Sequence, residues 1–336
     1  MLILVASMVL ATGFAACGAD DDSSSGSGTT ARTRDATLVL DFIPNAVHAG
    51  IYTAVANGYY EDNGINLKII EPTSTADTLR LTAAGKAEIG ISDVVDLAGQ
   101  IESGREVKGV MAILQRPAGG LITLEEEGIE SPSDLEAKIV GVTGVPSDDA
   151  TLDTIMADDG SSSDSVDKVT LGFNGVQSLM TGKVAAITGF IPADGVQVEE
   201  EGFPTRSFAL DEYGGPSYPG LVAFSTESRI ADDPDLMGGF VEATTRGYQD
   251  TLDDPEQGVD NLVSETQGVD GQLAAAQLDA YIPLMGGPDT YGRFTNESLE
   301  ELSTFLVGND LAMEPIAPGR YATNEWTGGD KLTGGG

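Results

Sequence analysis

Cysteine, histidine and basic residues are scarce in this sequence of 336 residues, and each shortage excludes a class of structure or chemistry. Cys17 is the single cysteine, so no disulfide can form within the chain. His48 is the single histidine, and without a second imidazole or a thiol nearby it cannot build a metal site. The sequence contains no CxxC pair, no Walker A motif and no GxSxG nucleophile elbow. We therefore expect no metal, no other cofactor and no catalytic residue.

Positive charge is also scarce, with 17 Lys and Arg against 54 Asp and Glu, for a formal net charge of −37. Nucleic-acid binding depends on neutralising phosphates, so this balance argues against a nucleic-acid partner. Anionic lipid headgroups would repel the same surface. The hydrophobic content of 40% is ordinary for a globular protein, and the length allows two lobes or two domains. We interpret the excess of carboxylates as a solvated acidic coat, which would suit a saline medium.

Long hydrophobic runs are absent except at the start of the chain, where residues 1–16 are almost wholly apolar or small. Cys17 follows directly, and a polar stretch rich in Ser, Gly and Asp comes next. This order resembles the signal and lipobox of bacterial lipoproteins. It predicts a signal peptide at 1–17, lipidation of Cys17 and a disordered acidic tether at 18–35. Phe14 stands where an aliphatic residue is usual, and the missing basic start leaves open a start codon further upstream.

Residues 38–67 predict a strand, a sharp turn and a helix, which together form half of a βαβ unit. The apolar strand ends before Asp41 and Phe42, and the following turn contains Asn45 and His48. In open α/β sheets, small ligands bind beyond the carboxyl ends of the strands. Free N–H donors at the start of the next helix add to such a site. The segment therefore predicts a binding crevice lined by a carboxylate, an aromatic ring, an amide and an imidazole.

Strands and helices alternate through the middle of the chain, and the C-terminal part is mainly helical. We expect strands at 65–70, 88–92, 107–114, 120–124 and 139–143, with helices at 75–84, 94–103 and 148–156. Further helix starts are predicted at 131–135, at Asp233 and at Pro255, followed by helices at 273–282 and 299–306. This alternation predicts an α/β fold with parallel sheets and helices on both of their faces.

A weak internal repeat relates residues 81–92 to residues 179–190. Each copy has the pattern of a helix end, a Gly-Lys turn and an apolar strand, LTAAGKAEIGIS in the first and LMTGKVAAITGF in the second. Such a repeat predicts two similar lobes. Small-molecule clefts form preferentially between units of this kind, so we expect the ligand site between the lobes.

Several motifs occur in a characteristic order over most of the chain after the tether: LDFIPNAVHAGIYTAVANGYYEDNGINL, AAGKAEIGISD, AILQRPAGG, SPSDLEAKIVGVTGVPSDD, GFNGVQSLMTGKVAA, DEYGGPSYPGLV and RYATNEW. They resemble a family of solute-binding proteins for the thiamine pyrimidine precursor and for aliphatic sulfonates, to which the fungal thiamine-pyrimidine synthase is related. The resemblance implies a type II periplasmic-binding-protein fold, in which two hinged α/β lobes close on a small molecule. Lobe 1 would comprise residues 36–118 and 223–330, and lobe 2 residues 119–222.

The resemblance also implies roles for individual residues. Phe42 lies where the family often has tryptophan and would stack on a flat heterocycle, with a core role equally open. His48 lies where the fungal synthase has a reactive histidine, and we expect it to hydrogen-bond the ligand. Asp194 would pair with the ring nitrogen and amino group of an aminopyrimidine, although its neighbours lack the usual aromatic residues. Asp41 and Asp93 are further candidate carboxylates, with capping or solvated roles as the alternatives.

The turn GVTGVPSDDA, residues 141–150, has free N–H groups and holds a phosphate in the synthase-like relatives. Here Asp148 and Asp149 follow at once and would repel a dianion, so we expect a neutral or cationic ligand without a phosphate. The complete predicted ligand-binding set is Asp41, Phe42, Asn45, His48, Ser92, Asp93, Thr143, Ser147, Asn174, Phe190, Asp194 and Tyr218.

We interpret the chain as an extracytoplasmic solute-binding lipoprotein of an ABC importer, which delivers a small heterocycle to separate permease and ATPase subunits. The expected ligand is a thiamine pyrimidine precursor, and riboflavin or a sulfonate is the alternative within this class. We expect a monomer anchored by lipid to the outer face of the cytoplasmic membrane, at the cell surface or in the periplasm. The alternative in another class is an enzyme like the fungal synthase, which would require a cysteine-rich iron-binding stretch that this chain lacks.

Overall fold

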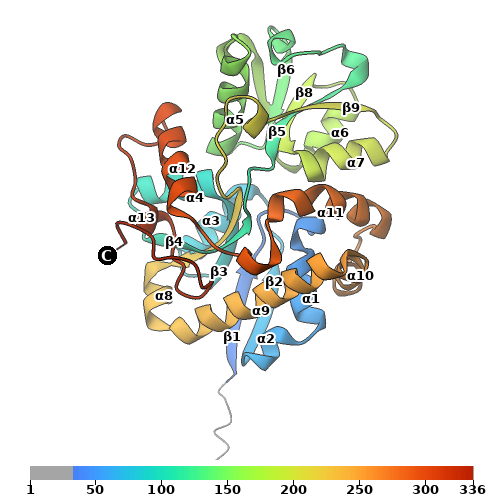
Figure 1. The fold of residues 1–336 in the computed structure, drawn as a ribbon. Helices are drawn as coiled ribbons and strands as arrows, with labels where there is room; N and C mark the ends of the chain where they lie inside the picture. The colour runs from blue at the N-terminus through green and yellow to red at the C-terminus, as the bar shows by residue number, and fades with distance from the viewer. Residues whose placement is uncertain (1–32, 336) are drawn as a thin grey trace, which may run out of the picture. The chain divides into compact units, whose positions relative to one another are not determined.

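Ten β-strands form two five-stranded sheets in residues 33–335, the part of the chain that the computed structural model describes. Sheet A has the strand order β2 (Ile65–Ile70), β1 (Arg34–Val39), β3 (Ile89–Asp93), β10 (Leu221–Thr226) and β4 (Val107–Leu114). Sheet B has the order β7 (Asp167–Thr170), β6 (Ile139–Val142), β8 (Ala186–Phe190), β5 (Gly119–Leu124) and β9 (Thr205–Ala209). Sheet A lies in the lower lobe of Figure 1 and sheet B in the upper lobe.

Helices accompany both sheets. Around sheet A are α1 (Ala49–Ala56), α2 (Tyr59–Asp62), α3 (Thr75–Ala83), α4 (Val94–Glu102), α8 (Glu227–Asp232), α9 (Pro234–Asp253), α10 (Pro255–Glu265), α11 (Gly271–Met285), α12 (Asn296–Gly308) and α13 (Pro318–Tyr321). Around sheet B are α5 (Pro146–Asp158), α6 (Gly175–Met180) and α7 (Val196–Glu200). Short 3₁₀ turns occupy Ala46–His48, Glu125–Glu127, Pro132–Leu135, Ser163–Ser165, Gly172–Asn174, Leu210–Glu212 and Pro288–Thr290, and Ile191–Gly195 forms one π-helical turn.

Both faces of sheet A are buried, as the alternation of helices and strands predicts. Successive residues of β10 point to opposite faces, because side chains alternate along a strand. Leu221 and Ala223 belong to the hydrophobic cluster under α1, α9 and α11. Val222 and Phe224 belong to the cluster under α4, α12 and α13. These two apolar layers hold the ends of the strands in place, and the strand ends carry the candidate site.

Both sheets are mixed, so the expectation of parallel sheets is wrong. β10 runs antiparallel to β3 and β4, and β5 runs antiparallel to β8 and β9. The chain enters sheet B through residues 115–118 and returns to sheet A through residues 210–220. A strand that follows a crossover helix begins at the end of the sheet far from the other lobe. A strand that arrives directly from the other lobe begins at the near end. It therefore runs against its neighbours.

Two strand boundaries differ from the sequence-based prediction. β1 begins at Arg34, inside the stretch predicted as a tether, because Arg34 pairs with Ile65 of β2 and its guanidinium contacts Asp233. β10 begins at Leu221, so residues 221–222 pair in sheet A although they were assigned to lobe 2. The predicted signal, Cys17 and the remainder of the tether lie outside the described residues.

The internal repeat corresponds to equivalent positions in the two sheets. β3 and β8 are each the third strand in their sheet, and each follows a helix and a glycine turn. Gly85 and Gly182 both have a left-handed backbone, with φ of 66° and 65°. Glycine adopts this conformation without the strain that a Cβ would cause, which is why it ends so many helices. The same local chemistry thus delivers one strand to each side of the cleft.

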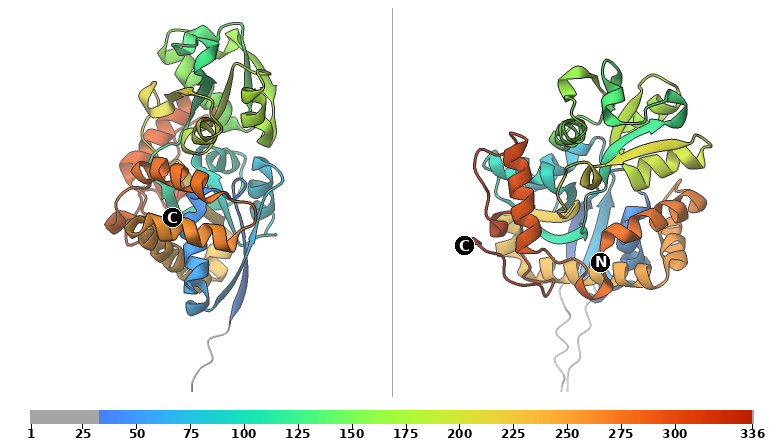
Figure 2. Two further views of the ribbon diagram at one scale, coloured as in Figure 1. Left: turned by 90° about the vertical axis from the view of Figure 1, so that its right-hand side faces the viewer. Right: turned by 45° about the horizontal axis from the view of Figure 1, so that its top comes forward.

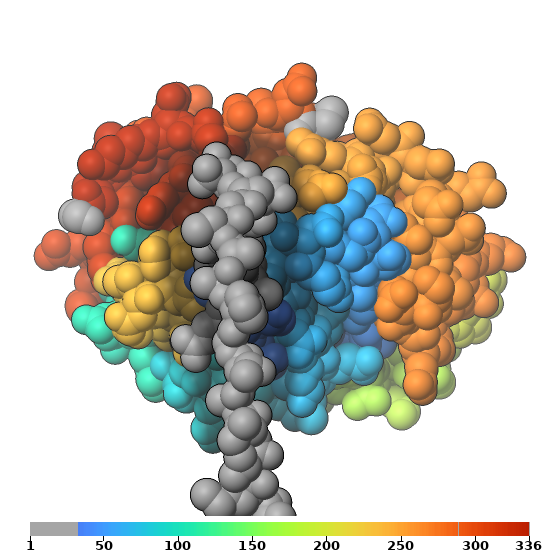
Figure 3. Space-filling view, turned by 90° about the horizontal axis from the view of Figure 1, so that it is seen from below, coloured from blue at the N-terminus to red at the C-terminus, as the bar shows by residue number. Residues whose placement is uncertain are grey.

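Residues far apart in the sequence form one continuous face of lobe 1. Seen from below, α1, α2 and β2 in blue lie beside α9 and α10 in orange (Figure 3). The two further views show α11 passing close beneath the upper lobe (Figure 2).

In residues 33–335, no helix is both long and apolar enough to cross a bilayer.

Candidate functional site

A cavity of about 100 Å³ lies between the two sheets, where strand ends and loops of both lobes meet. From the side of sheet A, it is lined by Asp41, Phe42, Asn45, Thr75, Asp93, Asp96 and Tyr281. From the side of sheet B, it is lined by Gly119, Gly120, Thr143, Val145, Ser147, Asp148, Thr151, Thr188, Gly189, Phe190, Ala193 and Asp194. The cavity is therefore built from many separate segments of the chain.

The structure brings most of the predicted ligand-binding residues to this cavity and leaves the others elsewhere. Those that line it are Asp41, Phe42, Asn45, Asp93, Thr143, Ser147, Phe190 and Asp194. Those that do not are His48, Ser92, Asn174 and Tyr218. The first group follows the carboxyl ends of strands or begins α5, which is where open α/β sheets place ligands.

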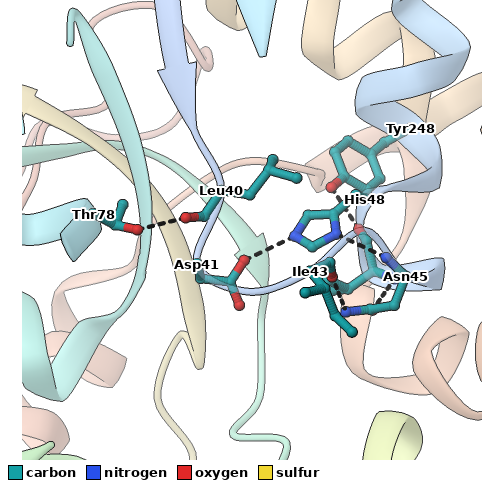
Figure 4. Close-up of polar contacts among 8 residues, drawn as sticks. Leu40, Asp41, Ile43, Asn45, His48, Thr78 and Tyr248 are labelled. Carbon is teal, nitrogen blue, oxygen red and sulfur yellow. Dashed lines mark hydrogen bonds and ion pairs between the residues drawn. The ribbon is translucent and has the colours of Figure 1, made fainter. Parts of the chain in front are cut away.

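His48 is buried and does not line the cavity, and its ring contacts Asp41 and Asn45, which do (Figure 4). Its Nδ1 accepts a hydrogen bond from the backbone N–H of Asn45 at 3.2 Å, so the ring proton is on Nε2. Nε2 then donates to Oδ1 of Asp41 at 2.8 Å. The imidazole is fully buried. Both ring nitrogens have protein partners and His48 does not line the cavity, so this structure presents no free ring nitrogen to a ligand.

Asn45 also has a structural role besides lining the cavity. Its Oδ1 accepts from the backbone N–H of Val47 at 3.0 Å, as an N-cap side chain does. Its amide nitrogen donates to the carbonyl of Ile43 at 3.1 Å. The turn that carries Asp41, Asn45 and His48 is thus fixed by its own side chains (Figure 4).

The other predicted residues outside the cavity have local explanations. Ser92 is buried and its hydroxyl donates to the carbonyl of Asp93 at 3.0 Å. Asn174 is exposed and its amide donates to the carbonyl of Leu171 at 3.3 Å. Tyr218 is buried against Phe305, with ring centroids 5.4 Å apart. Of the three, only Ser92 is adjacent to a lining residue, Asp93, and no residue next to Asn174 or Tyr218 lines the cavity.

Phe42 meets an aromatic residue from the other lobe rather than standing alone. Its ring centroid lies 4.3 Å from that of Phe173, with the ring planes at 63°. Edge-to-face pairs of this kind contribute about 0.5–1.5 kcal/mol beyond the area that they bury. Phe42 therefore both lines the cavity and forms a contact between the two lobes.

The turn at the start of α5 is filled by the carboxylate of Asp148. Oδ2 of Asp148 accepts from the Thr143 hydroxyl at 2.7 Å, from Gly144 N at 2.8 Å and from Val145 N at 3.0 Å. Oδ1 accepts from the Thr188 hydroxyl at 2.6 Å. Those N–H groups are the donors that would hold a phosphate at a helix N-terminus. The protein's own carboxylate occupies that place, and the hydroxyl of Thr143 is directed to it.

Asp96 joins the lobes through Ser147. The Ser147 N–H donates to Oδ1 of Asp96 at 3.0 Å, and the Ser147 hydroxyl donates to Oδ2 at 2.9 Å. Burial raises the pKa of the Asp96 carboxyl to about 7; the Ser147 hydrogen bonds oppose this shift, and nearby Asp148 adds to it. A buried carboxylate with two donors thus connects α4 to the N-terminus of α5.

Asp194 lies in the π-helical turn after β8. Its Oδ2 accepts from the backbone N–H of Phe190 at 2.9 Å. Burial raises the pKa of its carboxyl to about 7, the Phe190 hydrogen bond opposes this shift, and Asp148 adds to it. A Cβ on Gly189 would come within 2.4 Å of Oδ2, so only glycine at position 189 leaves room for this carboxylate. α11 reaches the same turn, where Gln277 donates to the carbonyl of Ala193 at 3.0 Å.

Asp93 combines an N-cap role with a place in the cavity wall. Its Oδ1 accepts from the backbone N–H of Val95 at 2.7 Å, at the start of α4. Burial, followed by the charge of Asp96, holds the pKa of this carboxyl well above its usual range, and the Val95 hydrogen bond opposes the shift. The carboxyl groups around the cavity therefore influence one another's protonation.

Tyr281 is a cavity residue that sequence reasoning did not identify. It comes from α11, is fully buried, and its hydroxyl has no hydrogen-bond partner among the described residues. Burial raises the pKa of this hydroxyl well above its usual range, and Asp194 and Asp41 add to the shift. A buried phenol normally has a hydrogen-bond partner, so this hydroxyl is a candidate contact for a ligand.

Sequence reasoning also missed four polar lining residues that lie on apolar or helical stretches without a motif: Asp96, Thr75, Thr151 and Thr188. For Asp96 the sequence did contain a signal. This carboxylate lies two positions after Val94 among apolar residues of the helix, which indicates that it faces inward. In residues 33–335, no group of three or more His, Cys, Asp or Glu side chains is arranged to hold a metal ion.

Residues 45–258 match the protein family described as NMT1/THI5 like. The chain is 26% identical over 285 residues to the formylaminopyrimidine-binding protein of Halalkalibacterium halodurans. The aligned region covers 83% of this chain and 86% of that protein. It is 25% identical over 281 residues to the 4-amino-5-hydroxymethyl-2-methylpyrimidine phosphate synthase of Schizosaccharomyces pombe. That aligned region covers 79% of this chain and 81% of the enzyme. Similar proteins thus include both a binding protein and an enzyme.

Solved structures resemble the chain over most of its length. The alkanesulfonate-binding protein SsuA of Xanthomonas axonopodis pv. citri, bound to MOPS, gives a TM-score of 0.69 at 12% identity, covering 85% of this chain and 96% of that one. A likeness at this identity shows the fold alone. It confirms the predicted periplasmic-binding-protein fold, with two α/β lobes and a cleft between them.

Proposed function

The chain belongs to the NMT1/THI5-like family, and from this premise we propose that it is the solute-binding component of an ABC importer. It captures a small heterocycle without a phosphate between its two lobes and presents it to a membrane permease. A thiamine pyrimidine precursor is the first candidate ligand. The observation that carries the proposal is the cavity itself, because both lobes contribute polar groups to its wall. A ligand that contacts both lobes favours their closed arrangement, to which a permease would respond.

The size of the cavity supports a ligand with a single ring. Its volume is about 100 Å³. An engineered protein cavity of about 150 Å³ admits benzene, which sets the scale for one six-membered ring. A pyrimidine with small substituents exceeds this volume slightly and would need a small outward movement of the lobes, whereas the three fused rings of riboflavin would need a much larger one.

The charge of the cavity supports a ligand without a phosphate or a sulfonate. Asp148 already accepts hydrogen bonds from the N–H groups of Gly144 and Val145. No Lys or Arg is among the lining residues. An anionic group would have to displace a hydrogen-bonded carboxylate and then face four further aspartates, which costs far more than those donors return.

An enzyme like the fungal synthase is the second candidate, and the similarity to the Schizosaccharomyces pombe enzyme favours it. The place of His48 supports a binding role instead. The resemblance aligns this residue with a reactive histidine, but here it is fully buried behind Asp41 and does not line the cavity. A catalytic imidazole must reach the substrate within hydrogen-bond distance.

The proposal includes an extracytoplasmic location with a lipid anchor at Cys17. It is supported by the apolar leader, the cysteine that follows it and the polar stretch before Thr33. We propose a monomer, since one chain supplies both walls of the cleft. The permease and the ATPase would be separate chains. Metabolic labelling with a radioactive fatty acid tests the anchor, and Cys17→Ser should abolish incorporation of the label.

A thermal-shift screen of the full chain in detergent tests the proposed ligand. The panel holds formylamino- and hydroxymethyl-pyrimidine precursors, riboflavin, taurine and a phosphorylated pyrimidine. A true ligand at a hundred times its dissociation constant adds about 2.7 kcal/mol of stability. We expect the shift with an unphosphorylated pyrimidine and its loss in Asp194→Ala. Asp149→Ala is the matched control, because Asp149 is exposed in the same segment as Asp148 but does not line the cavity. A shift with riboflavin or taurine alone would overturn the proposed ligand, and turnover of a pyrimidine would favour the enzyme.

A further inference from the structure

Carboxyl groups without a basic partner in the lining are the main chemical feature of the cavity. Its lining includes five aspartates, Asp41, Asp93, Asp96, Asp148 and Asp194, and contains no Lys, Arg or His. Carboxylates removed from water are costly unless a positive charge or several donors compensate them. The hydrogen bonds to each oxygen therefore show which of these groups the protein satisfies and which it leaves for a ligand.

Two of the five aspartates are satisfied by the protein. Both oxygens of Asp148 accept hydrogen bonds, from Thr143, Gly144 and Val145 on one oxygen and from Thr188 on the other. Both oxygens of Asp96 accept from Ser147. These two carboxylates hold the segments around the cavity in place.

The other three aspartates are each satisfied on one oxygen only. Oδ1 of Asp41 accepts from His48, Oδ1 of Asp93 from Val95 N, and Oδ2 of Asp194 from Phe190 N. The second oxygen of each has no hydrogen-bond partner among the described residues. The protein thus orients three carboxylates by one oxygen and leaves the other oxygen available, while each residue lines the same cavity.

A second and independent feature marks the same cavity as incomplete. The hydroxyl of Tyr281 is buried, lines the cavity and has no partner among the described residues. A phenol can both donate and accept, so it complements a polar ligand beside the three carboxylates. Asp41, Asp194 and Tyr281 line the same cavity.

We propose that the cleft selects a small organic cation, whose N–H groups donate to the free oxygens of Asp41, Asp93 and Asp194, with Tyr281 as a further hydrogen-bond partner. This inference rests on the proposed function and deepens it by giving the charge of the ligand: among unphosphorylated pyrimidines, the cleft prefers one with a protonated amino (ammonium) substituent to the neutral hydroxymethyl precursor. A protonated amine or an amidinium group on a single planar ring has the required size and donors. A neutral ligand of the same shape leaves the carboxylates without a counter-charge. Hydrogen bonds between charged partners are also roughly twice as strong as neutral ones.

A matched pair of ligands tests the charge directly in the unchanged protein. 4-Amino-5-hydroxymethyl-2-methylpyrimidine is neutral at pH 7, and its 5-aminomethyl analogue has nearly the same shape but carries an ammonium group. Isothermal titration calorimetry of the full chain in detergent at pH 7.5 should show that the aminomethyl compound binds about tenfold tighter or more, given the usual gain of a charged hydrogen bond. Benzamidine and benzamide form a second pair with an amidinium in place of the ammonium.

Variants identify the residues that read the charge. Asp93→Asn and Asp194→Asn should each reduce the preference for the charged member of the pair. Asp149→Asn removes the same unit of charge outside the cavity and should leave the preference unchanged. Tyr281→Phe removes no existing hydrogen bond within the protein, so it should fold normally and weaken ligand binding. The comparison of ligands needs no variant, so it decides the question even where an Asn variant fails to fold.

The outcomes separate this inference from the proposed function. Equal or tighter binding of the hydroxymethyl compound overturns the cation and leaves the pyrimidine-binding function intact. Binding of benzamidine but not of benzamide or of either pyrimidine supports the cation and overturns the pyrimidine. Binding of riboflavin or taurine alone overturns both, as does the absence of binding to every compound. Displacement of the ligand by millimolar calcium chloride would assign the free oxygens to a metal ion and overturn the organic cation.

Discussion

Ser147 and Asp96 connect the two lobes across the cleft, with the N–H and the hydroxyl of the serine each donating to one oxygen of the carboxylate at 3.0 and 2.9 Å. Ser147 is the second residue of α5, and Asp96 lies in the first turn of α4. The carboxylate thus compensates N–H groups at the start of a helix that belongs to the other lobe. Because each partner comes from a different lobe, we expect movement of the lobes apart to break this contact.

Removing the Ser147 hydroxyl should weaken ligand binding without damaging either lobe. Ser147→Ala keeps the N–H donor and loses one hydrogen bond to a carboxylate, so we expect about tenfold weaker ligand affinity. Titration calorimetry measures the affinity, and small-angle scattering should show a more open ligand-free form. Ser161→Ala is the control, because the Ser161 hydroxyl donates to Glu136 at 2.6 Å within the lobe of sheet B. Equal affinities of Ser147→Ala and the parent would show that this contact does not hold the lobes closed.

Removal of the Asp148 carboxylate should turn the start of α5 into an anion site. Asp148→Ala frees the donors at Thr143, Gly144, Val145 and Thr188, and we expect it to lower stability by about 2–3 kcal/mol. Phosphate at 50 mM should then raise the melting temperature of the variant above its value in chloride of equal ionic strength. Neither the parent nor Asp149→Ala should respond. A phosphate effect of equal size in all three proteins would contradict the assignment of Asp148 as an internal substitute for an anion.

Loss of the His48 side chain should disturb Asp41 and the turn around it. His48→Ala leaves a buried carboxylate and the Asn45 N–H without partners and creates a cavity, for a cost of roughly 3–5 kcal/mol. Urea unfolding measures the loss. His48→Gln should recover part of the stability and of the ligand affinity, since its amide N–H can donate to Asp41. A His48→Ala protein with unchanged stability would show that the imidazole does not support the turn.

The stability of the ligand-free protein should fall as the pH rises from about 4 to about 7. The pKa of Asp96 and that of Asp194 are each raised from 3.8 to about 7, so between these values the folded protein binds more protons than the unfolded chain. Stability then decreases with pH and levels off above the folded pKa, by at most on the order of 4 kcal/mol per group. Melting temperatures in 1 M NaCl, which screens the surface charge, measure the slope. Asp194→Asn should flatten it, whereas Asp149→Asn should not.

A methyl group at position 189 should displace Asp194 from its place. The added Cβ would lie 2.4 Å from Oδ2, so Gly189→Ala forces the carboxylate to move and should weaken ligand binding at least tenfold. Gly99→Ala is a matched glycine control within α4, where nothing lies within 4 Å of the new methyl. It should leave affinity unchanged and raise stability by about 0.5–1 kcal/mol. Normal affinity in Gly189→Ala would separate Asp194 from the ligand.

Local sequence patterns predicted the elements of the fold well. The strands expected at 65–70 and 107–114 coincide with β2 and β4, and the helices expected from Asp233 and Pro255 are α9 and α10. Proline at the first helical position and an aspartate cap are signals contained in a few adjacent residues. By contrast, the helix start expected at 131–135 yields only the 3₁₀ turn Pro132–Leu135, because no apolar stripe follows to extend it.

The site was predictable in part, and the reason differs from residue to residue. Asp41 and Asp194 follow strands, so their place beyond the carboxyl ends of the strands can be predicted from neighbouring residues. Tyr281 lies in the middle of α11, far from every motif, and only packing brings its hydroxyl to the cavity. His48 follows a strand as well, but its side chain turns inward to Asp41, which its position in the sequence does not reveal.

The sequence by itself determined the α/β class, the two lobes, the shortage of counter-charge and the position of the strand ends, because these depend on composition and short-range pattern. Only the tertiary structure decided which carboxylate oxygens are satisfied and which face the cavity. It also decided the mixed direction of the sheets and the contact between Ser147 and Asp96. The sheet directions and the contact between Ser147 and Asp96 depend on segments far apart in the sequence, 51 residues for this pair, and no local pattern encodes such a meeting. The bonds to Asp41, Asp93 and Asp194 are local, but only the folded chain shows which of their oxygens line the shared cavity.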